Sequence, residues 1–193
     1  MRTLVVAAYP PELAQLVTRA GVIGRAVGIG LVAASAGAER AIWEEQPSRL
    51  MVVGTAGALP GSQLAIGSVV VVVQARLGVR PGEYLPPMLQ SAINGDDALS
   101  RQCAEALDAP MVSAVCPIGI TSSDAEAERL GKSGAAVEHL ETFAIFAAAA
   151  RAGVPATALL AIANHVGANA AAEWRANRVA AESAALQALS RLL

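Results

Sequence analysis

Five consecutive valines, within the β-type run at residues 66–74, restrict most strongly how this chain can fold. β-Branched side chains favour extended backbone, and an uninterrupted apolar strand needs cover on both of its faces. Shorter apolar runs occur at residues 3–8, 49–54 and 156–163, and we interpret each as another buried strand. The chain is therefore expected to build a sheet that lies inside the protein.

Helical patterns alternate with these runs. Further expected elements are one or two strands over 24–35, a strand over 113–120, helices over 10–21, 37–46, 123–134 and 137–153, and a terminal helix from about Trp174. Alternating strands and helices predict a single α/β domain over residues 1–193, with a central mixed β-sheet flanked by helices. Residues 76–97, with three prolines, form the least patterned stretch and are interpreted as an excursion within that domain.

Composition excludes several classes of protein. A net charge of −2 without a Lys/Arg cluster argues against nucleic acid as a partner. Two cysteines, Cys103 and Cys116, and two histidines provide neither a disulfide framework nor a zinc set, so we expect no metal and no cofactor. No uncharged apolar segment reaches the roughly 18 residues of a membrane span, and the first residues do not resemble a signal peptide. The sequence predicts a cytoplasmic protein with a small-molecule ligand and no membrane contact.

Polar or small residues follow several expected strands, where α/β proteins usually bind ligands. Glu12 follows the first strand, residues 54–57 (Gly-Thr-Ala-Gly) follow the third, and Asn164 and His165 follow the strand at 156–163. Position alone also suits ordinary structural roles: an acid in the first turn of a helix, a tight strand exit, and turn or surface residues. These positions are therefore candidates, with both interpretations open.

Two acids precede a nearly all-apolar helical pattern. Glu138 and Glu141 are three residues apart, so on a continuous helix over 137–153 they would share one face. A buried carboxylate is costly unless a polar group meets it. We therefore expect a polar ligand or polar partners near these acids, with helix capping as a further explanation for Glu138.

Four segments together resemble the nucleoside phosphorylase and nucleosidase superfamily, which includes methylthioadenosine/S-adenosylhomocysteine nucleosidases and futalosine hydrolases. They are "AAYPPEL", "VGIGLVAASAGAERA", "VVGTAGALPGSQLAIGSVVVV" and "VEHLETFAIFAAAARAGVPATALLAIAN", in chain order. Within the group, "ANHVGANAAAEW" is most similar to futalosine hydrolases. The resemblance spans nearly the whole chain except residues 76–97 and implies the three-layer fold of the superfamily.

The resemblance also implies site residues. Glu12 matches the glutamate that activates water, and Glu141 matches the glutamate that holds the ribose hydroxyls, with Leu140 at the position usually taken by methionine. An enclosed carboxylate can offset the positive charge that develops on ribose as an N-ribosidic bond breaks. The backbone of Thr55, Ala56 and Gly57 is expected beside the substrate. Phe143 is a possible apolar neighbour of the base, with the helix core as the alternative.

Asn164 is expected to select the base. Adenosine nucleosidases of this group have an aspartate there, whereas an amide can donate to both N7 and the 6-oxo group of hypoxanthine. The leading hypothesis is hydrolysis of a purine nucleoside, futalosine above all, in menaquinone biosynthesis. Three alternatives stay open: an adenine-type nucleosidase, a purine nucleoside phosphorylase, and a nucleoside-binding protein without catalysis.

Water is preferred over phosphate as the acceptor. The segment "AAYPPEL" has no arginine and brings a carboxylate, which would repel an anion. Departures from the family pattern include Leu160 in place of an arginine and Asn169–Ala170 in place of an Arg-Asp pair, which leaves recognition of a charged substrate tail unassigned. The high apolar fraction, 54%, and the resemblance lead us to expect a homodimer or a larger homo-oligomer.

Overall fold

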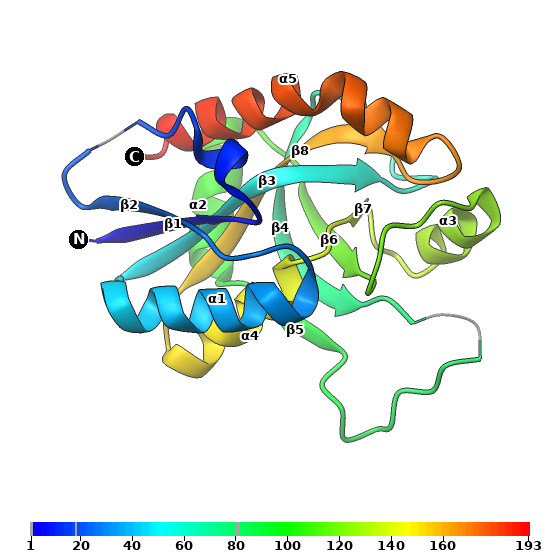
Figure 1. The fold of residues 1–193 in the computed structure, drawn as a ribbon, viewed down its shortest axis with the longest axis horizontal. Coiled ribbons are helices and arrows are strands. Elements are labelled where there is room, and N and C mark those ends of the chain that lie inside the picture. Colours follow the sequence, from blue (N-terminus) through cyan, green and yellow to red (C-terminus); the bar gives the residue numbers. More distant parts are fainter. Residues whose placement is uncertain (1, 18, 80–81) are drawn as a thin grey trace.

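A computed structural model describes residues 2–17, 19–79 and 82–193, and these build one mixed sheet between helices (Figure 1). The strands are β1 Thr3–Ala7, β2 Val22–Ala26, β3 Arg49–Ala58, β4 Val69–Leu77, β5 Ala92–Asn94, β6 Met111–Cys116, β7 Val137–Glu138 and β8 Ala156–His165. The helices are the 3-10 turn η1 Pro10–Leu13, α1 Gly30–Glu45, α2 Asp97–Leu107, α3 Asp124–Gly131, α4 Thr142–Ala152 and α5 Ala170–Ser190.

Strand β3 is the centre of the sheet. It runs parallel to β1 on one side and to β8 on the other, so the carboxyl ends of these three strands meet at one edge. Strand β8 pairs antiparallel with β4, β4 pairs with β6, β6 pairs with β7, and β7 pairs with the last two residues of β3. The pairing therefore leads from β3 through β8, β4, β6 and β7 back to β3. The segments that follow β1, β3 and β8 are neighbours at one edge.

Helices cover both faces of the sheet, as the apolar strands predict. Figure 1 shows α1 and α4 on one face and α5 on the opposite face. Successive residues of a strand point to opposite faces. Accordingly, Leu4 and Val6 pack in the cluster that contains α1 and α4, while Val5 and Ala7 pack in the cluster that contains α2 and α5. None of the helices in the described ranges is long and apolar enough to cross a membrane.

Two expectations near the amino terminus are wrong. The helix expected over 10–21 is only the 3-10 turn η1, which starts at the two prolines, as expected, but ends at Leu13. The strands expected over 24–35 end at Ala26, and helix α1 begins at Gly30. The backbone near Val27 explains this packing: a Cβ built on Gly37 would lie 2.0 Å from the Val27 carbonyl oxygen, so only glycine lets α1 approach so closely.

Later boundaries also differ from the expected ones. The pattern over 137–153 is the short strand β7 followed by α4, and the terminal helix begins at Ala170 rather than near Trp174. Strand β5 and helix α2 were not expected at all. A capping signal was present for α2, because the Asp96 carboxylate accepts the Leu99 N–H at 2.8 Å.

Candidate active site

The candidate site lies at the edge of the sheet where β1, β3 and β8 end. Glu12 comes from η1, directly after β1, and Asn164 is near the end of β8. Glu141 lies at the amino-terminal end of α4 and reaches α1, since its Oε1 accepts the Gly30 N–H at 2.8 Å. The structure thus brings strand ends and helix amino termini together around two carboxylates. Helix amino termini favour negative charge, which reduces the cost of burying Glu141.

Glu12 is held by backbone N–H groups. Its side chain is buried, Oε2 accepts the Ala8 N–H at 3.0 Å, and Oε1 accepts the Thr55 N–H at 3.2 Å. Gly54 makes room for this carboxylate, because a Cβ at that position would lie 2.8 Å from Glu12 Oε1. The two N–H contacts fix the orientation of the carboxylate and leave further lone pairs for a ligand.

The pKa of Glu12 is raised from 4.5 to about 7. Burial is the main cause, the N–H groups of Thr55 and Ala8 oppose it, and the charge of Glu141 raises the pKa further. A carboxyl group with a pKa near neutrality can both accept and release a proton at physiological pH, as a general base must.

Glu138 and Glu141 do not share a helix face, which corrects the sequence-based expectation. Glu138 is in β7, paired with Gly57 of β3, and Glu141 is the residue just before the first turn of α4. The chain changes direction between these two residues, so their carboxylates contact different neighbours. The two acids therefore have separate roles.

Glu138 is buried and incompletely satisfied. Its Oε1 accepts the Thr121 N–H at 3.1 Å, but no donor within the described ranges reaches Oε2. Burial raises the pKa of Glu138, and the contacts with Thr121 oppose that shift. A buried oxygen without a partner is unfavourable, which makes it a candidate contact for a ligand.

Asn164 lies on the other side of Gly57 from Glu138. The register between β3 and β8 shifts after Ala56, because β8 has one extra residue, Ala163, and this brings Gly57 opposite Asn164. A Cβ on Gly57 would lie 2.9 Å from the Asn164 amide nitrogen, which itself donates to the His165 carbonyl at 3.0 Å. Gly57 is thus in the strand between β7, which carries Glu138, and β8, which carries Asn164, and the backbones of these two outer strands are about 10 Å apart.

The other residues expected beside the substrate lie in different surroundings. Ala56 is buried in the cluster of α1 and α4, and Leu140 is half-buried next to Glu141 in sequence. Phe143 is half-buried and packs against the same cluster, so its contacts are those of a residue in the hydrophobic core. The Thr55 hydroxyl faces α5, where it accepts the Trp174 indole N–H at 3.1 Å.

A polar network beside the site was not anticipated. The Tyr9 hydroxyl donates to Glu182 of α5, and Arg178 lies 3.6 Å from the same carboxylate while its guanidinium covers the Trp174 ring at 5.5 Å. Burial and the contact with Glu182 raise the pKa of Tyr9 to about 12, so it stays protonated. Tyr9 is in the same short segment as Glu12, but its partner is 173 residues away, and no local pattern could reveal that pair.

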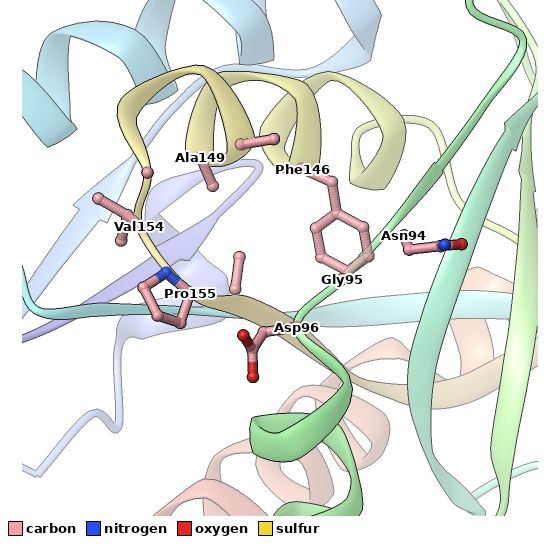
Figure 2. Close-up of a pocket in the computed structure, with 10 residues that line it drawn as sticks. Asn94, Gly95, Asp96, Phe146, Ala149, Val154 and Pro155 are labelled. Atoms are coloured by element: carbon pink, nitrogen blue, oxygen red, sulfur yellow. The ribbon is translucent and has the colours of Figure 1, made fainter.

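A separate hollow of about 250 Å³ lies at the other edge of the sheet (Figure 2). It is lined by residues 94–96, by α4 near Phe146, and by the segment that leads into β8. Figure 2 shows the Phe146 ring facing Gly95, with Asp96 below. Pro155 and Ala156 are at the start of β8, so this hollow is about 25 Å from Asn164 along the strand. Chemistry at Glu12 does not reach it.

Arg25, in strand β2, has partners other than the two carboxylates. Its guanidinium pairs with Glu45 and donates to the Gly24 carbonyl at 3.0 Å. The described contacts of Glu12 and Glu141 come from backbone N–H groups and from His139. Two carboxylates with backbone donors suit a neutral, hydroxyl-rich ligand better than a phosphate, which requires cationic or N–H-rich coordination.

Comparison with known proteins agrees with this architecture. Residues 12–193 match the sequence model of a family described as the phosphorylase superfamily. No curated protein matches the sequence. Among solved structures, futalosine hydrolase of Helicobacter pylori strain 26695 is 15% identical and superposes with a TM-score of 0.88 over 100% of this chain and 97% of that chain.

Nucleosidase structures are similar too. The 5'-methylthioadenosine/S-adenosylhomocysteine nucleosidase of Neisseria meningitidis, in complex with methylthio-immucillin-A, is 18% identical, with a TM-score of 0.85 over 100% of this chain and 98% of that chain. The corresponding nucleosidase of Colwellia psychrerythraea, in complex with adenine, is 19% identical, with a TM-score of 0.83 over 100% and 96%. These likenesses confirm the expected three-layer α/β fold.

Proposed function

Because the chain belongs to the phosphorylase superfamily, we propose that it is a nucleosidase that uses water to cleave the N-ribosidic bond of a purine nucleoside. The observation that carries this proposal is the state of Glu12: a buried carboxylate with a pKa of about 7, oriented by two backbone N–H groups. That combination suits a base which removes a proton from water.

The reaction assigns one task to each group. Glu12 accepts a proton from water as the oxygen attacks the anomeric carbon, and the bond from that carbon to the purine breaks with its electron pair going to the base. Glu141 accepts hydrogen bonds from the ribose hydroxyls and offsets the positive charge on the sugar. The Asn164 amide donates to the departing purine, which then takes a proton from solvent because an amide cannot supply one.

We propose a 6-oxopurine as the base, with futalosine, cleaved to hypoxanthine in menaquinone biosynthesis, as the leading substrate. A 6-oxopurine has acceptors at O6 and N7, which suit the Asn164 amide, and a donor at N1. The buried Oε2 of Glu138, which lacks a donor in the described ranges, lies on the opposite side of Gly57 and suits that N1–H. The second contact would then satisfy the Glu138 oxygen that is otherwise without a donor in the described ranges, while the Asn164 amide also donates to the His165 carbonyl.

An adenine nucleoside, such as a 5'-methylthioadenosine-type thioether, is the second candidate. The observation that favours it is the raised pKa of Glu138, since a protonated carboxyl group could donate to the unprotonated N1 of adenine. In that case the Asn164 side chain would donate to N7 through its NH2 group and accept from the exocyclic amine through its oxygen. The two candidates therefore differ in the protonation state they require of Glu138.

A product assay separates these possibilities. Purified protein is incubated with futalosine, inosine, methylthioadenosine and aminodeoxyfutalosine, each with and without phosphate, and the released base is identified by chromatography. Release of hypoxanthine from futalosine without phosphate is the expected result. Adenine release moves the assignment to the second candidate, phosphate-dependent release makes the protein a phosphorylase, and binding without release makes it a nucleoside-binding protein.

We also propose that the protein acts as a homodimer or larger homo-oligomer. On α1, Val32 and Trp43 are 87% and 80% exposed. Eleven residues are close to three helical turns, so both side chains lie along one stripe of the helix. Two exposed large apolar side chains on one side of a helix favour association with a second copy of the chain. Light scattering of the wild-type protein and of a Val32→Glu variant tests this proposal. If both proteins are monomeric, the proposal is wrong.

A further inference from the structure

His139 is a buried histidine that lies between Glu138 and Glu141 in the sequence, and the proposed reaction assigns it no role. Its side chain is 4% exposed, and its backbone N–H donates to the Val115 carbonyl of β6 at 3.1 Å. The ring therefore has a fixed position between β7 and the start of α4. A polar ring enclosed in this way requires partners on both of its nitrogens.

The contacts of Nδ1 determine where the ring proton lies. The Thr142 N–H points to Nδ1 at 3.2 Å, the Glu141 N–H points to it at 3.4 Å, and the Thr142 hydroxyl is 2.7 Å away. A backbone N–H can only donate, so Nδ1 must be the acceptor and the proton belongs on Nε2. Burial lowers the pKa of His139 and keeps the ring neutral, although the charge of Glu141 opposes the shift.

The protonated nitrogen faces the carboxylate assigned to ribose. His139 Nε2 is 3.4 Å from Glu141 Oε2, and Glu141 Oε1 already accepts the Gly30 N–H at 2.8 Å. Contacts of this length between catalytic groups commonly shorten when a substrate binds. The Gly30 hydrogen bond to Oε1 and the Nε2–H facing Oε2 together restrain the plane of the carboxylate and leave lone pairs on both oxygens for the two ribose hydroxyls.

We propose that His139 is a positioning residue, whose neutral Nε2–H tautomer orients the Glu141 carboxylate toward the ribose hydroxyls while Nδ1 secures the start of α4. The assignment of ribose to Glu141 rests on the proposed function, but the tautomer and the contact do not. His139 thus couples a helix terminus to the sugar-binding group through one ring.

Two conservative substitutions separate the functions of the two nitrogens. His139→Asn keeps a polar atom near the position of Nδ1 and removes the one that faces Glu141, so we expect a folded protein with kcat/KM reduced about 10- to 100-fold, the range for loss of a hydrogen bond to a charged group. His139→Gln keeps an amide near the position of Nε2 and removes the cap. We expect it to retain more activity than His139→Asn while it unfolds at lower denaturant concentration.

A double-mutant cycle with Glu141→Gln tests whether the two residues act together. If His139 acts through Glu141, the double variant loses little more kcat/KM than Glu141→Gln alone. Wild-type kcat/KM in His139→Asn, or fully additive losses in the cycle, would overturn the proposal and reduce His139 to a helix cap.

Nitrogen-15 NMR of labelled histidine provides a readout that needs no activity. The chain has two histidines, so a His165→Asn variant assigns both sets of ring signals. The neutral Nε2–H form of His139 at neutral pH is the expected result, and either an Nδ1–H tautomer or a charged ring would overturn the proposal. If wild-type protein cleaves no nucleoside, the proposed function fails, and this spectrum still decides the tautomer.

Discussion

The Thr55 N–H donates to Glu12 Oε1 at 3.2 Å, so the orientation of one buried carboxylate depends on a strand 43 residues further along the chain. The Ala8 N–H holds the other oxygen. Because both donors belong to the backbone, side-chain substitutions elsewhere in the site leave this arrangement in place. Glu12 can therefore be altered alone and its contribution measured.

Glu12→Gln is expected to lower the rate of base release about 10²- to 10⁴-fold, the usual contribution of a general base. The amide has nearly the same shape but cannot take a proton from water. The matched control is Glu44→Gln, since the Glu44 side chain is 53% exposed on α1. Rates from the chromatographic product assay provide the comparison, and an equally active Glu12→Gln protein would remove Glu12 from the mechanism.

The activity of the wild-type protein is expected to rise with pH through about 7, because only the ionised Glu12 can accept a proton. A plot of kcat/KM against pH measures this limb. If the rate does not change between pH 5 and pH 8, the reacting group is not a carboxyl group with the pKa of Glu12.

The contribution of Glu12 to the stability of the folded protein should fall as pH rises, in contrast to the activity. The folded pKa of Glu12 lies above its unfolded value of 4.5, so its contribution to stability is complete below 4.5 and is lost as pH rises through about 7. Urea unfolding of the wild-type protein and of Glu12→Gln across this range isolates the contribution of Glu12. We expect the difference in free energy of unfolding to favour Glu12→Gln increasingly as pH rises, and a constant difference would contradict burial as the cause.

Asn164→Asp is expected to shift preference from 6-oxopurine toward 6-aminopurine nucleosides. A carboxyl group can share a proton with N7 and accept from the exocyclic amine, whereas it repels the 6-oxo oxygen when ionised. The ratio of kcat/KM for futalosine to that for aminodeoxyfutalosine is the measurement, because the two differ only in the base. An unchanged ratio would show that Asn164 does not contact the base.

Glu138→Gln should shift the same ratio through a different atom. The amide loses the acceptor proposed for N1–H of a 6-oxopurine and gains a donor for N1 of adenine, so we expect futalosine cleavage to fall about 10- to 100-fold. Glu128→Gln, at an exposed position of α3, is the control. A variant that loses both activities equally would assign Glu138 to structure.

Trp174→Phe is expected to lower the free energy of unfolding by about 1 kcal/mol, the net value of a typical hydrogen bond. Phenylalanine keeps most of the apolar packing and removes the indole N–H that reaches Thr55. Urea titration measures the change, and a double-mutant cycle with Thr55→Val shows whether it comes from that contact. Strictly additive effects would mean that the bond contributes nothing.

The sequence by itself determined the elements whose signal is local. The runs at β1, β3, β4 and β8 predict buried strands because most of their residues are apolar, and the positions of Glu12 and Asn164 at strand ends follow from those runs. The start of α1 and the break between β7 and α4 were missed. There, glycine packing against a distant carbonyl and pairing with β3 override local propensity.

Only the tertiary structure decided the environment of each acid. Glu138 and Glu141 look equivalent in sequence, yet Glu138 contacts Thr121 while Glu141 contacts Gly30 and His139. Likewise, the partner of Tyr9 is 173 residues away. Burial and long-range hydrogen bonds set the charge state and orientation of a carboxylate, and both depend on neighbours that the fold brings together rather than on spacing along the chain.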